Sequence, residues 1–363
     1  MPARRVLGYY VTYDPTSWAA LEANAAHLDD VAGQWVTIDA CGQLGSRDDQ
    51  TLKQFAQSRG IRVFPSLLTG SGWLNNRLLT DEATTATAIA QIADYVEAEG
   101  YDGFDLDLEG VRPADRAAYT AFVARLGAAL HERGKLLTLA IPAKAGETTT
   151  GWAAAYDYAA LGQHADLITL MAYEYRGAFS GPGSVAPYDW VDRVLAFATS
   201  QIPAEKILLG LAFYGHDWNT TSGGSRALGY VRAAALAEYH GVPIVLDPET
   251  QSATFRYRAV VGEGPPPRTL PPPPQHEVTV RERPPCPVVP PAPAPTPTPR
   301  PTPPPGTVEE HEVWLEESAA ATARLRLAER YNVGGVAMWR LGLEDPQAWP
   351  SLEQWRRGIV QPE

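Results

Sequence analysis

The chain carries eight short apolar runs, and segments with apolar residues at helical spacing separate most of them. The runs occupy residues 6–13, 31–39, 62–68, 101–110, 136–144, 165–174, 206–215 and 333–343. The segments at 81–99 and 113–133 have the spacing of amphipathic helices. Strands that alternate with helices form a parallel sheet covered by helices. The pattern predicts an α/β fold, and eight units favour a closed (β/α)8 TIM barrel. A doubly wound open sheet is the alternative, but no glycine-rich phosphate loop follows any run.

The alternation stops between residues 216 and 316. Within this stretch, residues 226–239 predict a helix, and residues 254–257 and 311–314 alternate like two arms of a hairpin. We therefore expect a catalytic barrel at 1–215 and 317–363, with a small α+β insertion at 216–316 after the seventh strand. Residues 265–305 hold 20 of the 33 prolines, and proline has no N–H to donate. This composition predicts a Pro-rich disordered segment at about 262–308, either a surface spacer or a ligand for domains that bind PxxP motifs.

Composition excludes several classes of partner. The net charge of -12, without a basic stripe, argues against nucleic acid. No apolar run reaches about 18 residues, so we expect no membrane span, and the first run is too short for a secretory signal.

Cys41 and Cys286 form neither a disulfide framework nor a metal-ligand pattern, and we expect Cys286 to be a free, exposed thiol. We expect the protein to be a monomer.

The fourth run is acidic along one face. In a strand, alternate side chains point to opposite sides, which puts Asp105, Asp107 and Glu109 on one face. Neighbouring acids on that face lie roughly 6.5–7 Å apart, so their charges raise one another's pKa. An edge strand with a solvated acidic face is the alternative. At the mouth of a barrel, such a cluster indicates chemistry or cation binding, because burying unpaired carboxylates is unfavourable.

The residue types around this run favour glycoside hydrolysis without a metal ion or cofactor. A calcium loop is excluded because Arg116 stands at its twelfth position. A two-metal hydrolase would use histidines at neighbouring strand ends, but only His216 follows a strand end, and we interpret it as a polar loop residue. Asp107 and Glu109 share one strand and one face, so they cannot flank a sugar ring from opposite sides. One acid, Glu109, plus a nucleophilic acetamide from the substrate fits better. Asp107 would then hold the acetamide N–H, and Asp105 would share a proton with Asp107.

The acidic run also resembles a known signature. Asp102-x-x-Asp105-x-Asp107-x-Glu109 is similar to the DxxDxDxE motif of glycoside hydrolase family 18, the chitinase-like family. Residues 171–174 resemble its M-x-Y-D element, and Trp339 resembles the tryptophan that floors its sugar site. The resemblance implies catalytic roles for Glu109, Asp107, Asp105 and Tyr173. It implies substrate binding by Tyr9, Asp102, Met171, Glu174, Tyr214 and Trp339.

One departure from the motif points to a subgroup. Glu174 stands where chitinases have Asp, and residues 171–175, 202–207, 214–218 and 339–345 look more like bacterial spore-germination and cortex-lytic N-acetylglucosaminidases. This resemblance implies a retaining, substrate-assisted hydrolase of β-linked N-acetylglucosamine in peptidoglycan. Such an enzyme acts outside the cell or in the cell wall or spore envelope. The alternatives are a chitinase or chitooligosaccharide hydrolase, a non-catalytic lectin-like barrel, and a scaffold protein with a Pro-rich arm.

Overall fold

Eight parallel strands form a closed barrel in the computed structural model, which describes residues 4–267, 269–291 and 303–359. Strand β1 pairs with both β2 and β15, and these two pairings close the ring. Each predicted apolar run coincides with one barrel strand, so the predicted TIM barrel is confirmed. The barrel strands are β1 (Arg5–Val11), β2 (Asp30–Ile38), β4 (Arg62–Thr69), β5 (Gly103–Leu108), β6 (Leu136–Pro142), β7 (Leu167–Met171), β8 (Ile207–Ala212) and β15 (Gly335–Trp339).

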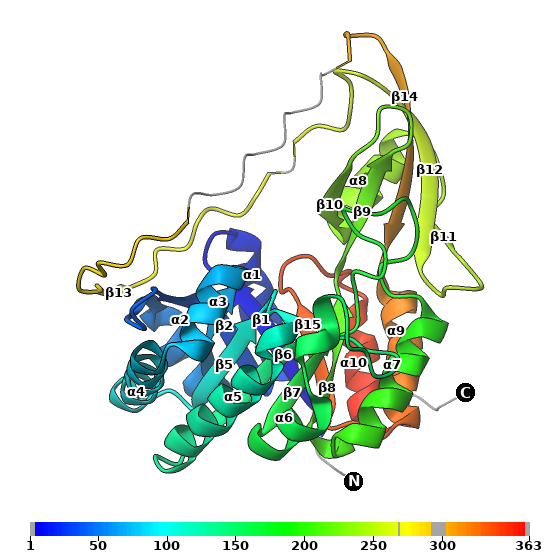
Figure 1. The fold of residues 1–363 in the computed structure, drawn as a ribbon. Coiled ribbons are helices and arrows are strands. Elements are labelled where there is room, and N and C mark those ends of the chain that lie inside the picture. The colour runs from blue at the N-terminus through cyan, green and yellow to red at the C-terminus, as the bar shows by residue number, and fades with distance from the viewer. Residues whose placement is uncertain (1–3, 268, 292–302, 360–363) are drawn as a thin grey trace.

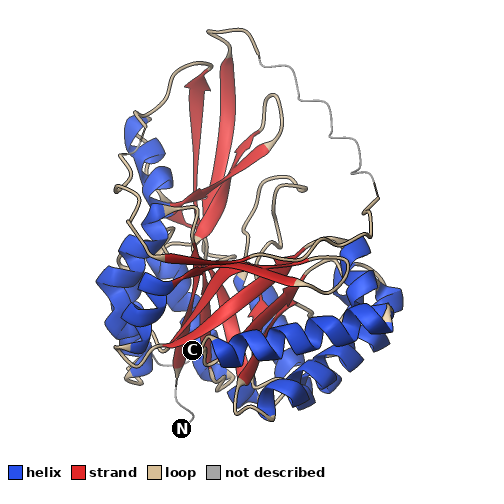
Figure 2. Ribbon diagram, turned by 90° about the vertical axis from the view of Figure 1, so that its left-hand side faces the viewer, coloured by secondary structure: helices blue, strands red, loops and turns tan. Residues whose placement is uncertain are grey.

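Helices surround the barrel on its outside (Figure 2). Local capping interactions define where the helices begin and end. The Asp81 side chain caps the start of α4 by accepting a hydrogen bond from Thr84 N. Gly134, with φ +67°, follows the end of α5 and allows the chain to leave the helix. None of the described helices is long and apolar enough to cross a membrane. The outer helices are α1 (Pro15–Asn24), α2 (Gln50–Gln57), α3 (Gly72–Thr80), α4 (Glu82–Ala98), α5 (Arg116–His131), α6 (Tyr158–His164), α7 (Tyr188–Gln201), α9 (Ser318–Arg330) and α10 (Ala348–Arg356). Short 3-10 turns are η1 (Ala25–His27), η2 (Pro113–Asp115), η3 (Trp152–Ala155) and η4 (Ala204–Lys206).

The two faces of β5 differ as predicted. Phe104, Leu106 and Leu108 are buried in the main apolar core. Asp105 points the other way and meets polar side chains of three other barrel strands: Tyr9 of β1, Ser66 of β4 and Thr138 of β6. A separate apolar cluster, which includes Leu7, Ala32 and Leu208, fills the barrel interior beside this polar layer. The acids of β5 therefore lie inside a barrel whose outer contacts are apolar.

The insertion after β8 forms a second sheet that projects from the barrel (Figure 1). Strand β12 pairs antiparallel with β14, with Thr254 opposite Trp314 and Tyr257 opposite His311, so the predicted hairpin is confirmed. The predicted helix at 226–239 is shorter than expected, because residues up to Gly229 belong to a strand that pairs with β9. The elements of the insertion are β9 (Tyr214–Asn219), β10 (Ser225–Gly229), α8 (Tyr230–Tyr239), β11 (Val245–Leu246), β12 (Ala253–Val260) and β14 (Val308–Leu315).

Part of the Pro-rich segment is ordered against the barrel, where the sequence predicted neither strand nor helix. From the insertion, the chain reaches the far rim of the barrel and forms β13 (Val278–Arg281), which pairs antiparallel with β3 (Leu44–Asp49) (Figure 1). The physical reason lies in the local composition: residues 275–283 contain no proline, and Val278 and Val280 favour a strand. The His276 ring contacts Trp18, and its Nδ1 lies 2.5 Å from Asp49 Oδ2. Residues 292–302 of the predicted disordered segment lie outside the described residues.

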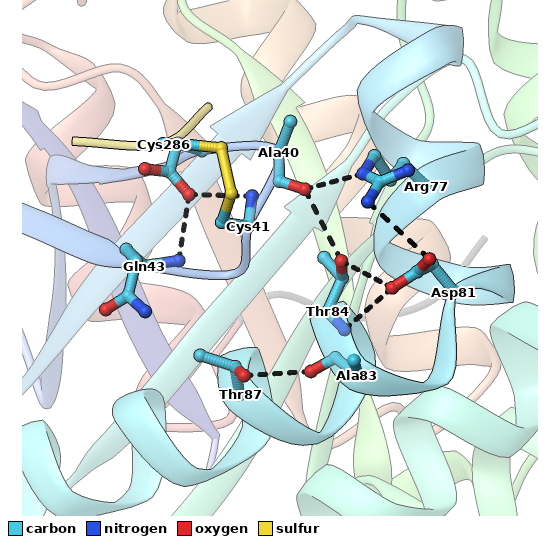
Figure 3. The surroundings of a disulfide bond; sticks show 10 residues. Ala40, Cys41, Gln43, Arg77, Asp81, Ala83, Thr84, Thr87 and Cys286 are labelled. Atoms are coloured by element: carbon cyan, nitrogen blue, oxygen red, sulfur yellow. Dashed lines mark hydrogen bonds and ion pairs between the residues drawn. A yellow bond between two sulfur atoms is a disulfide. The ribbon is translucent and has the colours of Figure 1, made fainter. Parts of the chain in front are cut away.

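The cysteines form a disulfide, which corrects the expectation of a free thiol at Cys286. Cys41 and Cys286 are 245 residues apart in sequence, and their Cα atoms lie 5.8 Å apart (Figure 3). Pairing of β13 with β3 brings Cys286 to the turn after β2, where the Asp39 carboxylate accepts hydrogen bonds from the backbone N–H groups of Cys41 and Gln43. This contact depends on the tertiary path of the Pro-rich segment, so cysteine spacing gave no sign of it.

Candidate active site

Asp105 lies at the bottom of the acidic row, fully buried and bound by hydroxyl groups. Ser66 Oγ donates to Asp105 Oδ2 at 2.7 Å, and Thr138 Oγ1 donates to Asp105 Oδ1 at 2.6 Å. Tyr9 OH lies 3.5 Å from the same Oδ1. Burial raises the pKa of Asp105 to about 6, although the hydroxyl donors oppose this shift. Asp105 can therefore exchange a proton near neutral pH.

Asp107 is the next acid along the row and has an unsatisfied acceptor. Its side chain is buried, and Oδ1 has no hydrogen-bond partner among the described residues. Burial, and then the charges of Glu109 and Asp105, raise the pKa of Asp107 well above its usual range. A buried acceptor without a partner is unfavourable unless a ligand supplies a donor. Asp107 thus has a free position for a substrate N–H or O–H group.

Glu109 follows the last residue of β5 and stands at the barrel mouth. Its backbone is fixed on both sides, because Glu109 N donates to Thr69 O at 2.8 Å and Asn75 Nδ2 donates to Glu109 O at 2.5 Å. Gly110 then turns the chain with φ +68°, a conformation that favours glycine. Burial and the negative charge of Glu174 raise the pKa of the Glu109 carboxyl. These conditions favour a protonated carboxylic acid, which is the form a general acid needs.

Residues after β7 and on β9 face the acidic row. Tyr173 is half-buried, and burial together with the charge of Asp107 raises its pKa well above the usual range. Glu174 Oε1 accepts a hydrogen bond from Tyr214 OH at 2.6 Å and lies 3.0 Å from His216 Nε2. Burial alone would raise the pKa of Glu174, but the bonds from His216 and Tyr214 outweigh it and lower that pKa. Glu109 and Glu174 therefore favour opposite protonation states.

These side chains border one cavity of about 430 Å³ at the mouth of the barrel. Trp339 at the end of β15 packs edge-on against Tyr9, with ring centroids 5.6 Å apart, and gives the cavity an aromatic wall. Apolar rings beside a few polar groups are typical of sites that bind small molecules and sugars. The lining residues are Tyr9, Asp107, Glu109, Ala140, Pro142, Ala143, Trp152, Ala153, Met171, Tyr173, Glu174, Trp190, Tyr214 and Trp339.

The structure brings together eight of the ten predicted site residues at this cavity, and Asp105 lies directly behind them. Asp102 does not belong to the group. It precedes β5, and its Oδ2 accepts a hydrogen bond from Val63 N at 2.8 Å. Six residues of extended chain lie between it and Glu109, which corresponds to a distance of about 23 Å. Asp102 ties β5 to β4 at the opposite end of the barrel, so the structure does not bring it together with the other predicted substrate-binding residues.

Three cavity or near-cavity residues were missed by the sequence analysis. Trp152 lies in η3 after β6, and Trp190 lies in the first turn of α7. Both lie in the connections that follow the carboxyl ends of barrel strands β6 and β7, and this location was the available sequence signal. His216 was treated as a polar loop residue, but it is a buried member of β9 that contacts Glu174.

A single group in the described part of the chain has the spacing of a metal site. It consists of Asp39, Cys41 and Cys286. The disulfide joins the two cysteines of this group, so their sulfurs are not thiolate ligands.

Comparisons with known proteins agree with this geometry. The profile of the family described as "Glycosyl hydrolases family 18" matches residues 5–344. The glycosylase YvbX of Bacillus subtilis is 22% identical, covering 95% of this chain and 90% of its own. The cortical fragment-lytic enzyme of Bacillus subtilis is 27% identical, covering 76% of this chain but only 54% of its own length. This chain thus spans about half of that enzyme.

Solved structures share the fold. A chitinase from Chromobacterium violaceum superposes with a TM-score of 0.79 at 26% identity, covering 97% of this chain and 99% of its own. The spore cortex-lytic enzyme SleL of Bacillus cereus also gives 0.79, at 23% identity, and covers 97% of this chain and 74% of its own. The family profile spans nearly all of this chain, including the acidic row and the residues after β7. This chain therefore belongs to glycosyl hydrolases family 18 and is a glycosidase.

Proposed function

We propose that this chain is a retaining β-N-acetylglucosaminidase in which the acetamide of the substrate acts as the nucleophile. The observation that carries this proposal is the arrangement of the acidic row. Asp107 lies on β5, Glu109 follows the end of this strand, and both border one cavity, while a pair of carboxylates that attacks a sugar from both sides must flank it. A nucleophile supplied by the substrate removes the need for a second attacking carboxylate.

The residues of the row then take separate roles. Glu109 donates its proton to the glycosidic oxygen as the bond to the anomeric carbon breaks. The acetamide oxygen attacks that carbon from the other side, and the unpartnered Oδ1 of Asp107 accepts the acetamide N–H. Tyr173 donates its hydroxyl proton in a hydrogen bond to the acetamide oxygen. Asp105, held by Ser66 and Thr138, shares a proton with Asp107 and limits the charge buried in the barrel.

The names of the curated relatives support peptidoglycan as the substrate. Three of the curated relatives are named as cortical fragment-lytic enzymes, at 26–27% identity. The chitinase 1 of Aphanocladium album is 30% identical but covers only 51% of this chain. Chitin-type oligosaccharides remain the second candidate, supported by the chitinase from Chromobacterium violaceum. Glu174, one carbon longer than the aspartate of chitinases, also favours the first candidate.

The disulfide supports a place of action outside the cytoplasm. Disulfides such as Cys41–Cys286 form and persist in oxidising compartments. Cell wall and spore cortex both lie outside the cytoplasm, so the redox chemistry and the proposed substrate agree. We propose that the enzyme works there as a monomer.

A lectin-like barrel that binds amino sugars without cutting them is the competing function. The structure offers a specific observation against it. The acid, Glu109, is present, its backbone is fixed, and its environment favours the protonated form. Turnover therefore separates the two functions.

The test is hydrolysis of a chromogenic β-N-acetylglucosaminide, purified spore-cortex peptidoglycan and chitin oligosaccharides by wild type and Glu109→Gln. We expect kcat to fall by about 10²–10⁴-fold, because Gln cannot donate the proton. Glu132→Gln, at an exposed position after α5, is the matched control and should keep full activity. Retention is read from the anomer of the first product. A wild type that binds the sugars but releases no product would support the lectin, and equal rates for wild type and Glu109→Gln would remove Glu109 from the mechanism.

A further inference from the structure

Groups outside the acidic row bind the carboxylate of Glu174, whose side chain is 45% exposed at the cavity. The same oxygen, Oε1, accepts from Tyr214 OH and contacts His216 Nε2. The other oxygen, Oε2, lies against the backbone of Gly177: a Cβ added at Gly177 would lie 1.9 Å from it. Glu174 itself adopts φ +60°, a backbone conformation that non-glycine residues rarely take. Strain of this kind persists where the surrounding contacts fix the residue.

His216 is the contact that the reaction scheme above leaves unused. Its ring is 4% exposed and lies on β9 between Tyr214 and Trp218, with ring centroids 5.9 and 5.1 Å away. A carboxylate accepts hydrogen bonds, so the contact of Nε2 with Glu174 requires a proton on Nε2. Nδ1 is buried with no partner among the described residues. The ring is therefore placed so that its Nε2–H group points at Glu174.

Glu174 and Glu109 border the same cavity from different strands. Glu109 follows β5, whereas Glu174 follows β7. The other ionisable side chains that border this cavity are Asp107, Tyr9, Tyr173 and Tyr214, and none of them is a cation. Glu174 is the charged neighbour whose negative charge acts on Glu109 and favours its protonated form. A fixed anion beside a carboxyl group does this without taking part in the reaction.

We propose that Glu174 and His216 form a positioning pair that fixes a negative charge beside Glu109 and so keeps this acid protonated as the pH rises. The inference rests on the proposed function, because it assigns a partner to the proposed acid. His216 acts through Glu174 and does not touch the substrate. Glu174 remains ionised because Tyr214 and His216 donate to it, and its charge extends the pH range over which Glu109 holds its proton.

The test compares pH profiles of kcat/KM on a chromogenic β-N-acetylglucosaminide. Glu174→Gln keeps the shape of the side chain and removes its charge. Glu109 then loses its proton at a lower pH, so the alkaline limb of the profile should move to lower pH. We expect kcat/KM to fall about tenfold relative to wild type at the alkaline end and to approach wild type at the acid end. Loss by the same factor at every pH would overturn the proposal, because it would indicate a binding role alone.

Two further changes disturb the carboxylate without replacing it. His216→Phe removes the N–H donor and keeps a ring, whereas His216→Gln offers an amide N–H at a similar position. We expect His216→Phe to move the alkaline limb in the same direction as Glu174→Gln, and His216→Gln to restore most of the alkaline activity. Gly177→Ala should behave like His216→Phe, because the new methyl group must displace Glu174 Oε2.

Gly181→Ala is the matched control for Gly177→Ala. Gly181 lies in the same loop, and a Cβ added there would meet no atom within 4 Å. Its profile should superimpose on that of wild type. Thermal unfolding of each variant shows that the fold is intact before the profiles are compared. If the wild type is active and the alkaline limbs of Glu174→Gln, His216→Phe and Gly177→Ala coincide with the wild-type limb, the positioning pair is refuted. An inactive wild type would instead refute the proposed function.

Discussion

The disulfide should stabilise the fold more than most single contacts, because it closes a very long loop. Cys41 and Cys286 are separated by 245 residues, and loop-closure entropy grows with the logarithm of that number. The chain-entropy relation gives about 5.5 kcal/mol at 25 °C for a loop of this length. Measured losses on removing native disulfides lie at about 2–5 kcal/mol. We therefore expect the free energy of unfolding to fall by about 2–5 kcal/mol when the bond is absent.

Other contacts of the Pro-rich segment should keep the reduced protein folded. His276 Nδ1 contacts Asp49 Oδ2 at 2.5 Å, and Glu277 N donates to Thr51 Oγ1 at 3.0 Å. These contacts and the β13–β3 ladder remain when the sulfur bond is broken. The reduced state should therefore unfold in a cooperative transition at lower denaturant concentration. Its unfolded chain is less compact, so the slope of free energy against denaturant should also increase.

The assay is guanidinium unfolding followed by tryptophan fluorescence. It compares oxidised wild type, wild type with dithiothreitol, Cys286→Ser and the double variant Cys41→Ser/Cys286→Ser. The two serine variants and the reduced wild type should share one midpoint, below that of the oxidised protein. The double variant should not respond to dithiothreitol, which controls for effects of the reductant itself. Coincident transitions for oxidised and reduced wild type would refute the reasoning, because the loop closure would then contribute nothing.

Two further predictions concern buried charge. The folded-state pKa of Asp105, about 6, exceeds its usual 3.8, so the ionisation of this group should cost up to about 3 kcal/mol of stability as the pH rises from about 4 to 6. Asp105→Asn should lose this dependence, so thermal unfolding should show it to be more stable than wild type at pH 7.5 but not at pH 4; an equal difference at both values would contradict the prediction. Arg324 contacts Glu316 at 3.1 Å, with both side chains 3% exposed, and Arg324→Leu should destabilise by about 3–5 kcal/mol because it leaves Glu316 buried without its partner. Denaturant unfolding of Arg324→Leu and of Arg324→Leu/Glu316→Leu measures the loss, and the double variant should recover stability. A loss below about 1 kcal/mol in the single variant would contradict the prediction.

The barrel and most of its site were accessible from the sequence, because both follow from short-range rules. The period-two pattern of residues 104–109 separates the apolar face from the acidic face within six positions. Parallel strands of a barrel end on one side, so residues at successive strand ends, such as Tyr173 and Trp339, meet there without further information. The same rule explains why Asp102 lies away from the other predicted site residues. The motif includes this residue, but strand direction places it at the opposite end of β5.

Contacts that depend on the path of the insertion could not be predicted in this way. Cys286 meets Cys41 because a proline-free stretch of the Pro-rich segment adds a strand to β3. His216 reaches Glu174 because residues after β8 continue as β9 instead of entering a helix. Neither contact has a local sequence signal, since each joins residues at least 42 positions apart. The role of a loop tryptophan such as Trp152 is equally hard to predict, because nothing in its immediate sequence distinguishes a residue of a cavity wall from one on an exposed surface.

Depth within one barrel separates the roles of chemically similar acids. Asp105 is enclosed by hydroxyl donors, Asp107 has a buried acceptor without a partner, and Glu109 meets the open cavity. All three have raised pKa values, and the pKa of about 6 at Asp105 lets that group ionise near neutral pH. Glu174, which follows β7, has instead a lowered pKa because donors from β9 bind it. The insertion begins with that strand, and it therefore contributes to the charge balance of the site as well as to its shape. Changes within β9 should therefore alter the pH dependence of catalysis even where they leave every residue of the acidic row in place.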